Sequence, residues 1–120
     1  MKDELQKAES ADAVLITSDC LGTGSEELGK ILMKSFLNTL WNHKPRPGKI
    51  LFINGGVLLT TEGSEVLETL ELLEKEGVEI FSCGTCLAFY GIKDKLRIGK
   101  ITNMPYIVDS LLSAARVVTI

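Results

Sequence analysis

The chain has 120 residues, 45% of them hydrophobic, and a formal net charge of -3. This length fits one domain, and the hydrophobic share is enough for a core and too high for a disordered chain. No apolar run approaches the roughly 20 residues of a membrane-spanning helix, and the polar start lacks the apolar centre of a signal peptide. No basic stripe marks a nucleic-acid partner. The composition therefore favours a cytoplasmic globular protein without a nucleic-acid or membrane partner.

The predicted elements alternate between strands and helices. We expect residues 1–12 to form a polar lead-in and residues 13–120 a single domain. Continuous β-branched and apolar runs predict buried strands, and apolar residues at helical spacing predict helices between them. The predicted strands cover 13–17, 50–53, 78–81, 98–102 and 117–120, and the predicted helices 26–41, 64–76, 86–90 and 103–115. This order predicts about five mostly parallel strands between helical layers, an α/β fold of the three-layer α/β/α sandwich type.

The first and last long helices are rich in apolar residues. In the first, the helical period is followed by Leu28, Ile31, Leu32, Phe36 and Leu40, and the apolar surface is broadened by Met33, Leu37 and Trp41. A helix this apolar is either well buried or contacts another subunit. In the last helix, the predicted buried face consists of Ile107, Val108, Leu111, Leu112 and Ala115.

Two glycine-containing loops allow more than one interpretation. Asn54-Gly55-Gly56 ends the second strand and could begin a hairpin with 57–60 as the return strand, but the helical pattern that follows favours a strand-to-helix loop. Gly22 and Gly24 invite a phosphate-loop interpretation, yet the Gly-Lys-Ser/Thr ending and a third glycine at the right spacing are missing. Turn geometry is the better explanation for these two glycines.

Loops that leave the carboxyl ends of parallel strands lie along one edge of the sheet, where ligands bind. The predicted loops of this kind are 18–25, 54–61, 83–86 and 103–105. They contain all three cysteines of the chain, Cys20, Cys83 and Cys86. His43 instead follows a helix, so we expect it at the opposite edge, where it cannot act as a base or metal partner for the thiols.

The Cys83-x-x-Cys86 spacing is the most suggestive chemical feature. Cys86 opens a predicted helix, and a thiol near a helix N-terminus loses its proton more easily. The spacing fits a redox pair, a thiolate that carries sulfur as a persulfide with the other cysteine assisting, or two inert thiols at a tight turn. The redox interpretation is weakened because Pro105 precedes a helix rather than a strand. A zinc site would need a fourth ligand, such as Asp19 or a residue of a second subunit.

The two most specific motifs are Cys-Gly-Thr-Cys-Leu at 83–87 and Asn-Gly-Gly-Val at 54–57. Together with Ser18-Asp19, Gly22-Thr23-Gly24 and Asn103-Met104, they resemble the C-terminal DsrE/DsrF-like domain of YedF-type proteins, which are sulfurtransferase-like and linked to selenium metabolism. The resemblance runs from Val14 almost to the end of the chain. YedF-type proteins usually carry a TusA-like domain ahead of this one, where this chain has only its polar lead-in.

The resemblance implies a homo-oligomer that relays sulfur, or selenium, through a cysteine in the loop after the third strand. It also implies sulfur donors and acceptors as partners, such as a cysteine desulfurase or a TusA-like domain. No cofactor and no metal are predicted. Cys20 does not belong to the family pattern, so the resemblance gives it no catalytic role.

The leading hypothesis is a persulfide carrier in which Cys86 or Cys83 is the catalytic thiol. The backbone amides of Gly84 and Thr85 would stabilise its charge, and Asn54 and Asn103 would orient it. The predicted substrate-binding set is completed by Gly55, Ser18, Asp19 and Cys20. The alternative is a non-catalytic oligomeric module that binds a small anion or a thiol compound at the same edge.

Overall fold

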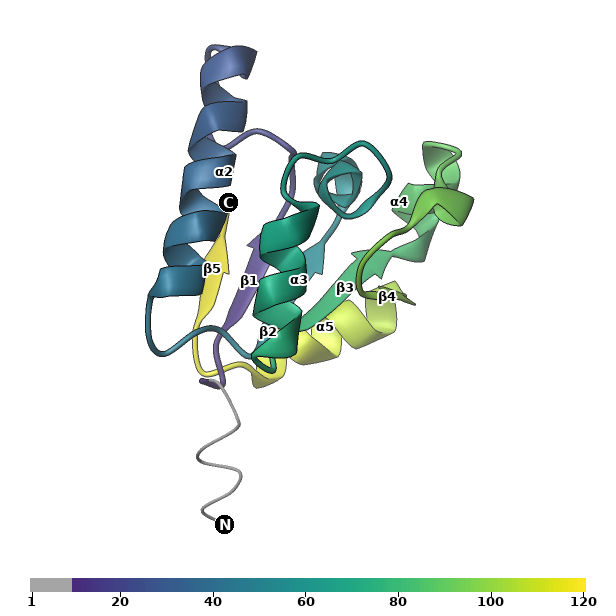
Figure 1. The fold of residues 1–120 in the computed structure, drawn as a ribbon. Coiled ribbons are helices and arrows are strands. Elements are labelled where there is room, and N and C mark those ends of the chain that lie inside the picture. The colour runs from purple at the N-terminus through teal and green to yellow at the C-terminus, as the bar shows by residue number, and fades with distance from the viewer. Residues whose placement is uncertain (1–9) are drawn as a thin grey trace.

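A computed structural model describes residues 10–120 and shows one parallel five-stranded sheet flanked by helices (Figure 1). The strands are β1 (Ala13–Ile16), β2 (Lys49–Phe52), β3 (Glu79–Cys83), β4 (Lys100–Thr102) and β5 (Val117–Thr119), in the order β4-β3-β2-β1-β5. The α-helices are α2 (Glu26–Asn42), α3 (Leu67–Lys75), α4 (Gly84–Phe89) and α5 (Met104–Ser113), and the 3-10 helices are η1 (Asn54–Thr60) and η2 (Lys93–Lys95). The predicted α/β fold is confirmed.

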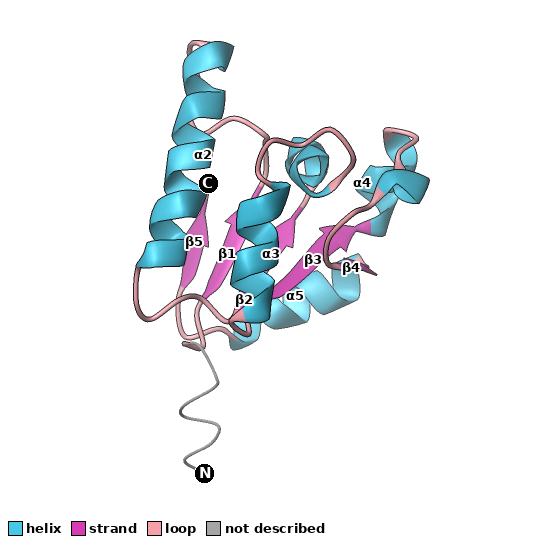
Figure 2. Ribbon diagram, viewed as in Figure 1, coloured by secondary structure: helices cyan, strands magenta, loops and turns pink. Residues whose placement is uncertain are grey.

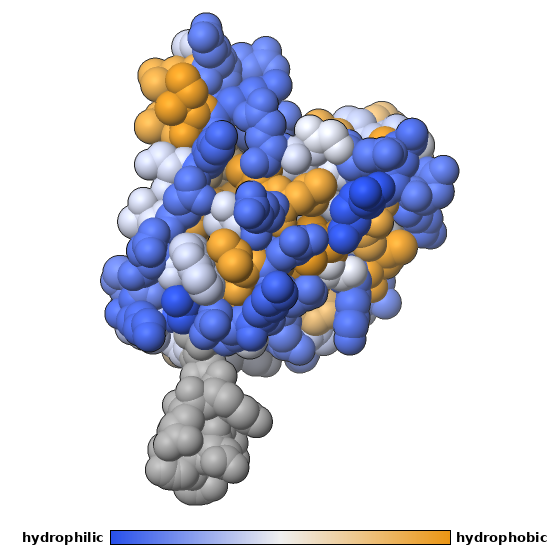
Figure 3. Space-filling view, in the orientation of Figure 1, coloured by the Kyte–Doolittle hydropathy of each residue, from blue (hydrophilic) through white to orange (hydrophobic). Residues whose placement is uncertain are grey.

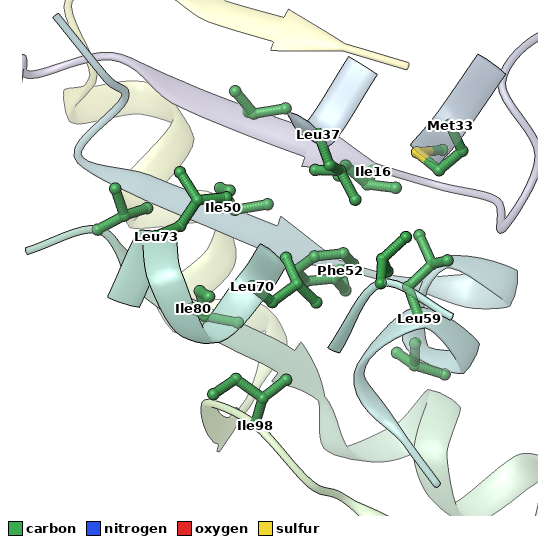
Figure 4. Packing of buried hydrophobic residues seen from close by; sticks show 14 of the residues in the cluster. Ile16, Met33, Leu37, Ile50, Phe52, Leu59, Leu70, Leu73, Ile80 and Ile98 are labelled. Carbon is green, nitrogen blue, oxygen red and sulfur yellow. The ribbon is translucent and has the colours of Figure 1, made fainter. Parts of the chain in front are cut away.

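Helices cover both faces of the sheet (Figure 2). In register, Val14, Ile50 and Ile80 share one face, because side chains alternate along a strand. They pack in one buried cluster with Met33 and Leu37 of α2 and with Leu70 and Leu73 of α3 (Figure 4). On the other face, Leu51 packs with Ile107 of α5. The sheet is therefore the middle of three layers.

The buried stripe of α2 differs from the predicted one. Gly29, Met33 and Leu37, spaced four residues apart, face the core, whereas Leu28, Ile31 and Leu32 are exposed. Figure 3 shows apolar side chains on the surface at the upper end of this helix. Two apolar stripes share the helical period, and packing against α3 and the sheet selects the one that contains the small Gly29.

The predicted buried face of α5 is also partly wrong. Ile107 is buried, but Val108 and Leu112 are exposed, Leu112 by 82%. The helix packs on the sheet through Ile107 and Leu111. Its outer stripe, which carries Val108 and Leu112, is exposed among the described residues.

The segment after β2 is neither a hairpin nor an open loop. Residues 54–60 form η1, and α3 begins at Leu67 rather than at the predicted residue 64. The Ser64 hydroxyl accepts a hydrogen bond from the backbone N–H of Val66 (3.2 Å), which closes a turn before the helix. A Cβ atom on Gly56 would overlap the carbonyl oxygen of Ile16, so this close approach to β1 requires glycine.

The start of the described chain is attached to the domain. Most of the predicted lead-in, residues 1–9, lies outside the described residues. The backbone N–H of Ser10 donates to the carbonyl of Arg46 (2.9 Å), and the Asp12 carboxylate pairs with the Arg116 guanidinium (2.8 Å). Among residues 10–120, no helix combines the length and apolar character needed to cross a membrane.

Candidate functional site

The carboxyl ends of the strands lie at one edge of the sheet, as expected for parallel strands (Figure 1). β3 extends two residues beyond its predicted end and finishes at Cys83, and α4 starts directly at Gly84. Cys83 is thus the last strand residue and the residue immediately before α4, and Cys86 is the third residue of this helix. His43 caps the other end of α2, just before β2 begins, and so lies toward the opposite edge.

The two thiols of this corner differ in burial. Cys83 is 2% exposed and packs against Leu51 and Ile107 on the face of the sheet that α5 covers. Cys86 is half-buried and borders both core clusters. Cys86 is therefore the thiol that a reagent or a protein partner reaches first.

A backbone amide from the neighbouring loop points at the Cys86 thiol. The N–H of Asn54 donates to Cys86 Sγ over 3.1 Å. Asn54 has a φ of 51°, the left-handed conformation that asparagine tolerates better than most residues. Its side-chain oxygen accepts a hydrogen bond from the Tyr90 hydroxyl at 3.0 Å. Sequence reasoning missed Tyr90, although its position four residues after Cys86 on one helix was a usable signal.

The pKa of the Cys86 thiol is shifted in the direction opposite to the one that a helix N-terminus alone would produce. Burial raises the pKa of the Cys86 thiol above its ordinary value, the Asn54 amide opposes this rise, and the contact with Cys83 adds to it. The free chain therefore keeps Cys86 largely protonated at neutral pH.

Two other predicted site residues, Asn103 and Gly84, have structural contacts. The Asn103 side chain accepts a hydrogen bond from the backbone N–H of Tyr106 (2.9 Å) and caps α5. Gly84 lies against β4, where an added Cβ would come within 3.0 Å of Ile101 Cγ2. Thr85 is exposed. Asn103 is thus committed to its own helix rather than directed at the thiols.

The loop after β1 contributes a second part of the edge. A Cβ atom added to Gly55 would lie 3.7 Å from Ser18 Cα, 3.8 Å from the Asp19 backbone nitrogen and 3.9 Å from the Tyr90 hydroxyl. The structure therefore brings Ser18, Asp19 and Gly55 beside Tyr90.

Cys20 belongs to a different corner of the edge. Its Sγ lies 3.6 Å from the carbonyl oxygen of Glu26, and its Cβ lies close against Gly29 of α2. Burial raises the pKa of the Cys20 thiol, and the nearby Asp19 carboxylate raises it further. Its contacts are therefore with α2 and its own loop, whereas Cys83 and Cys86 contact each other.

Within residues 10–120, no three His, Cys, Asp or Glu side chains gather closely enough to hold a metal ion.

Comparisons with known proteins agree with this architecture. Residues 32–120 match the DsrE/DsrF-like family. The fold is similar to the crystal structure of the ychN protein from E. coli, with a TM-score of 0.68 at 20% identity over 91% of this chain and 99% of that one. It is also similar to MTH1491 of Methanobacterium thermoautotrophicum, described as a protein of unknown function, with a TM-score of 0.69 at 18% identity over 91% and 97%. No curated protein matches the sequence. Because the family match covers most of its length, the chain belongs to the DsrE/DsrF-like family.

Proposed function

We propose that this protein is a sulfur-relay protein that carries a persulfide on Cys86. The observation that carries the proposal is the Asn54 N–H directed at Sγ of a half-buried cysteine, 3.1 Å away. The DsrE/DsrF-like family is associated with sulfur relay in general, which supports this chemistry. Cys83 is too buried to meet a protein donor, so we assign the sulfur-carrying role to Cys86 alone.

The transfer step needs no cofactor. The Cys86 thiolate attacks the outer sulfur of a donor persulfide, a new S–S bond forms on Cys86, and the donor S–S bond breaks. The donor cysteine leaves as a thiolate, so the transfer moves one sulfur atom without net oxidation or reduction. The Asn54 N–H stabilises the attacking thiolate, because hydrogen bonds to a charged form favour that form.

The partners follow from this step. We propose a cysteine desulfurase or a TusA-like domain as donor or acceptor, and perselenide transfer by the same displacement in a YedF-type role. The exposed apolar residues of α2 and α5 support a homo-oligomer. The mass of the protein in solution, measured by light scattering, tests this, and a monomer mass would contradict it.

The central experiment loads the protein with sulfur. Incubation with a cysteine desulfurase and cysteine, followed by mass spectrometry, should add one sulfur atom to the wild type. Cys86→Ser should abolish the addition, and Cys83→Ser should still gain one sulfur atom, because the buried Cys83 does not carry it.

Cys20→Ser is the matched control, because Cys20 contacts α2 instead of Cys86, and it should load like the wild type. Equal labelling of the wild type and the Cys83→Ser, Cys86→Ser double variant would contradict the proposal. That result would favour the alternative, a module that binds a small anion or a thiol compound without carrying sulfur.

A further inference from the structure

A chain of two hydrogen bonds links the outer end of α4 to the thiol at its start. The Tyr90 hydroxyl donates to Asn54 Oδ1 (3.0 Å), and the Asn54 N–H donates to Cys86 Sγ (3.1 Å). Tyr90 caps the end of α4 four residues after Cys86, so both face the η1 segment. Asn54 is therefore held on both sides by one helix.

The direction of the Asn54 amide depends on an uncommon backbone conformation. At a φ of 51°, Asn54 turns the chain sharply between β2 and η1. Left-handed conformations of non-glycine residues cost free energy and persist where their surroundings hold them. Gly56 fixes one end of this turn by its approach to Ile16, whereas Asn54 itself is exposed. The bond from Tyr90 restrains the side chain of this exposed residue, in addition to the bond between its N–H and Cys86 Sγ.

We propose that Tyr90 is a positioning residue for the Cys86 thiol, because its hydroxyl holds Asn54 in the conformation that directs the backbone N–H at Sγ. The inference rests on the proposed function in taking Cys86 as the working thiol. Without this bond, Asn54 samples conformations in which its amide turns toward water. The thiolate then loses a donor in a site where burial already disfavours it.

The exposure of Tyr90 limits how much its hydrogen bond can change the reactivity of Cys86. Tyr90 is 40% exposed, so water competes for both ends of its bond to Asn54. One neutral hydrogen bond corresponds to a factor of about two to ten in an equilibrium. We therefore expect Tyr90→Phe to slow alkylation of Cys86 at pH 7 by about two- to tenfold.

The test measures thiol reactivity, not sulfur transfer. Full-length wild type and Tyr90→Phe are alkylated with iodoacetamide from pH 6 to pH 10, and tandem mass spectrometry separates Cys86 from Cys83. Tyr90→Phe should move the Cys86 profile to higher pH. Tyr106→Phe is the matched control: it removes the hydroxyl of the other tyrosine, whose ring packs on Phe81 at 4.9 Å, and should leave the profile in place.

A second variant separates positioning from a general loss of stability. Asn54→Gly removes the acceptor of the Tyr90 bond while glycine still adopts the left-handed conformation. It should shift the Cys86 profile as Tyr90→Phe does. The double variant should shift the profile no further, because both changes remove the same hydrogen bond between Tyr90 and Asn54.

An unchanged Cys86 profile in Tyr90→Phe overturns the inference, whether or not the melting temperature falls. Additive shifts in the double variant overturn it as well. The proposed function fails on a different result, the absence of sulfur on Cys86 after desulfurase treatment. The two failures are therefore distinguishable.

Discussion

At the scale of single residues, the site depends on differences between similar groups. Cys83 and Cys86 are three positions apart, yet one ends a strand inside the core and the other is half-buried on a helix. Cys83 nevertheless influences Cys86, because its contact raises the pKa of the Cys86 thiol. The buried Cys83 thus raises the pKa of the more accessible Cys86.

This influence gives a prediction at the residue scale. Cys83→Ala removes one cause of the raised pKa of Cys86, so the thiolate fraction at pH 7 should increase. Alkylation of Cys86 should become faster, by about two- to fivefold, because burial, the larger cause, remains.

Site-resolved mass spectrometry of the alkylated protein measures this rate. Cys20→Ser serves as the control and should leave the rate unchanged. A slower reaction in Cys83→Ala would show that Cys83 assists the thiolate instead of opposing it.

At the scale of elements, the site depends on how η1 packs between β1 and α4. Gly55 and Gly56 follow each other in this segment but have different surroundings. An added Cβ finds ordinary van der Waals distances at Gly55 and overlaps the backbone of Ile16 at Gly56. A backbone atom in a central strand cannot move aside as a flexible side chain does.

The two glycines therefore form a matched pair of variants. Gly56→Ala should destabilise the fold by about 1–3 kcal/mol, the range expected when a buried site is overfilled. Gly55→Ala should change the free energy of unfolding by less than about 1 kcal/mol. Urea denaturation followed by circular dichroism measures both, and equal stability of the two variants would contradict the packing described here.

At the scale of the whole molecule, an ion pair joins the two ends of the described chain. Asp12 precedes β1, Arg116 precedes β5, and their side chains meet at 2.8 Å. The hydrogen bonds from Arg116 hold the pKa of Asp12 below its ordinary value. The pair therefore stabilises the fold above the ordinary pKa of an aspartate, and this contribution is lost as the pH falls through the lowered pKa.

Arg116→Ala should thus lower the melting temperature at pH 7, and the difference from the wild type should shrink below about pH 4. Because the arginine is exposed, the difference at pH 7 should be small. Thermal melts at pH 7, 5 and 3 test this. In a protein that already carries Asp12→Asn, the loss of melting temperature caused by Arg116→Ala should no longer depend on pH. A difference that grows toward low pH would refute the assignment.

The order of the elements and the edge of the sheet that carries the cysteines are both readable from local residue patterns. Continuous runs such as Val14 to Ile16 predict buried parallel strands from local pattern alone, and parallel strands necessarily gather their following loops at one edge. The Cys83-Cys86 spacing was visible for the same reason, since it is a property of consecutive residues.

The buried apolar stripes of α2 and α5, and the groups that touch the thiol, depend instead on how the elements pack. Leu28 and Met33 fit the helical period equally well, and the choice between them depends on contacts with α3 and the sheet. Asn54 precedes Cys86 by 32 positions, and its N–H reaches the thiol because β2 and β3 are neighbours and Asn54 adopts a left-handed conformation. Such contacts depend on long-range packing, which no local pattern of residues encodes.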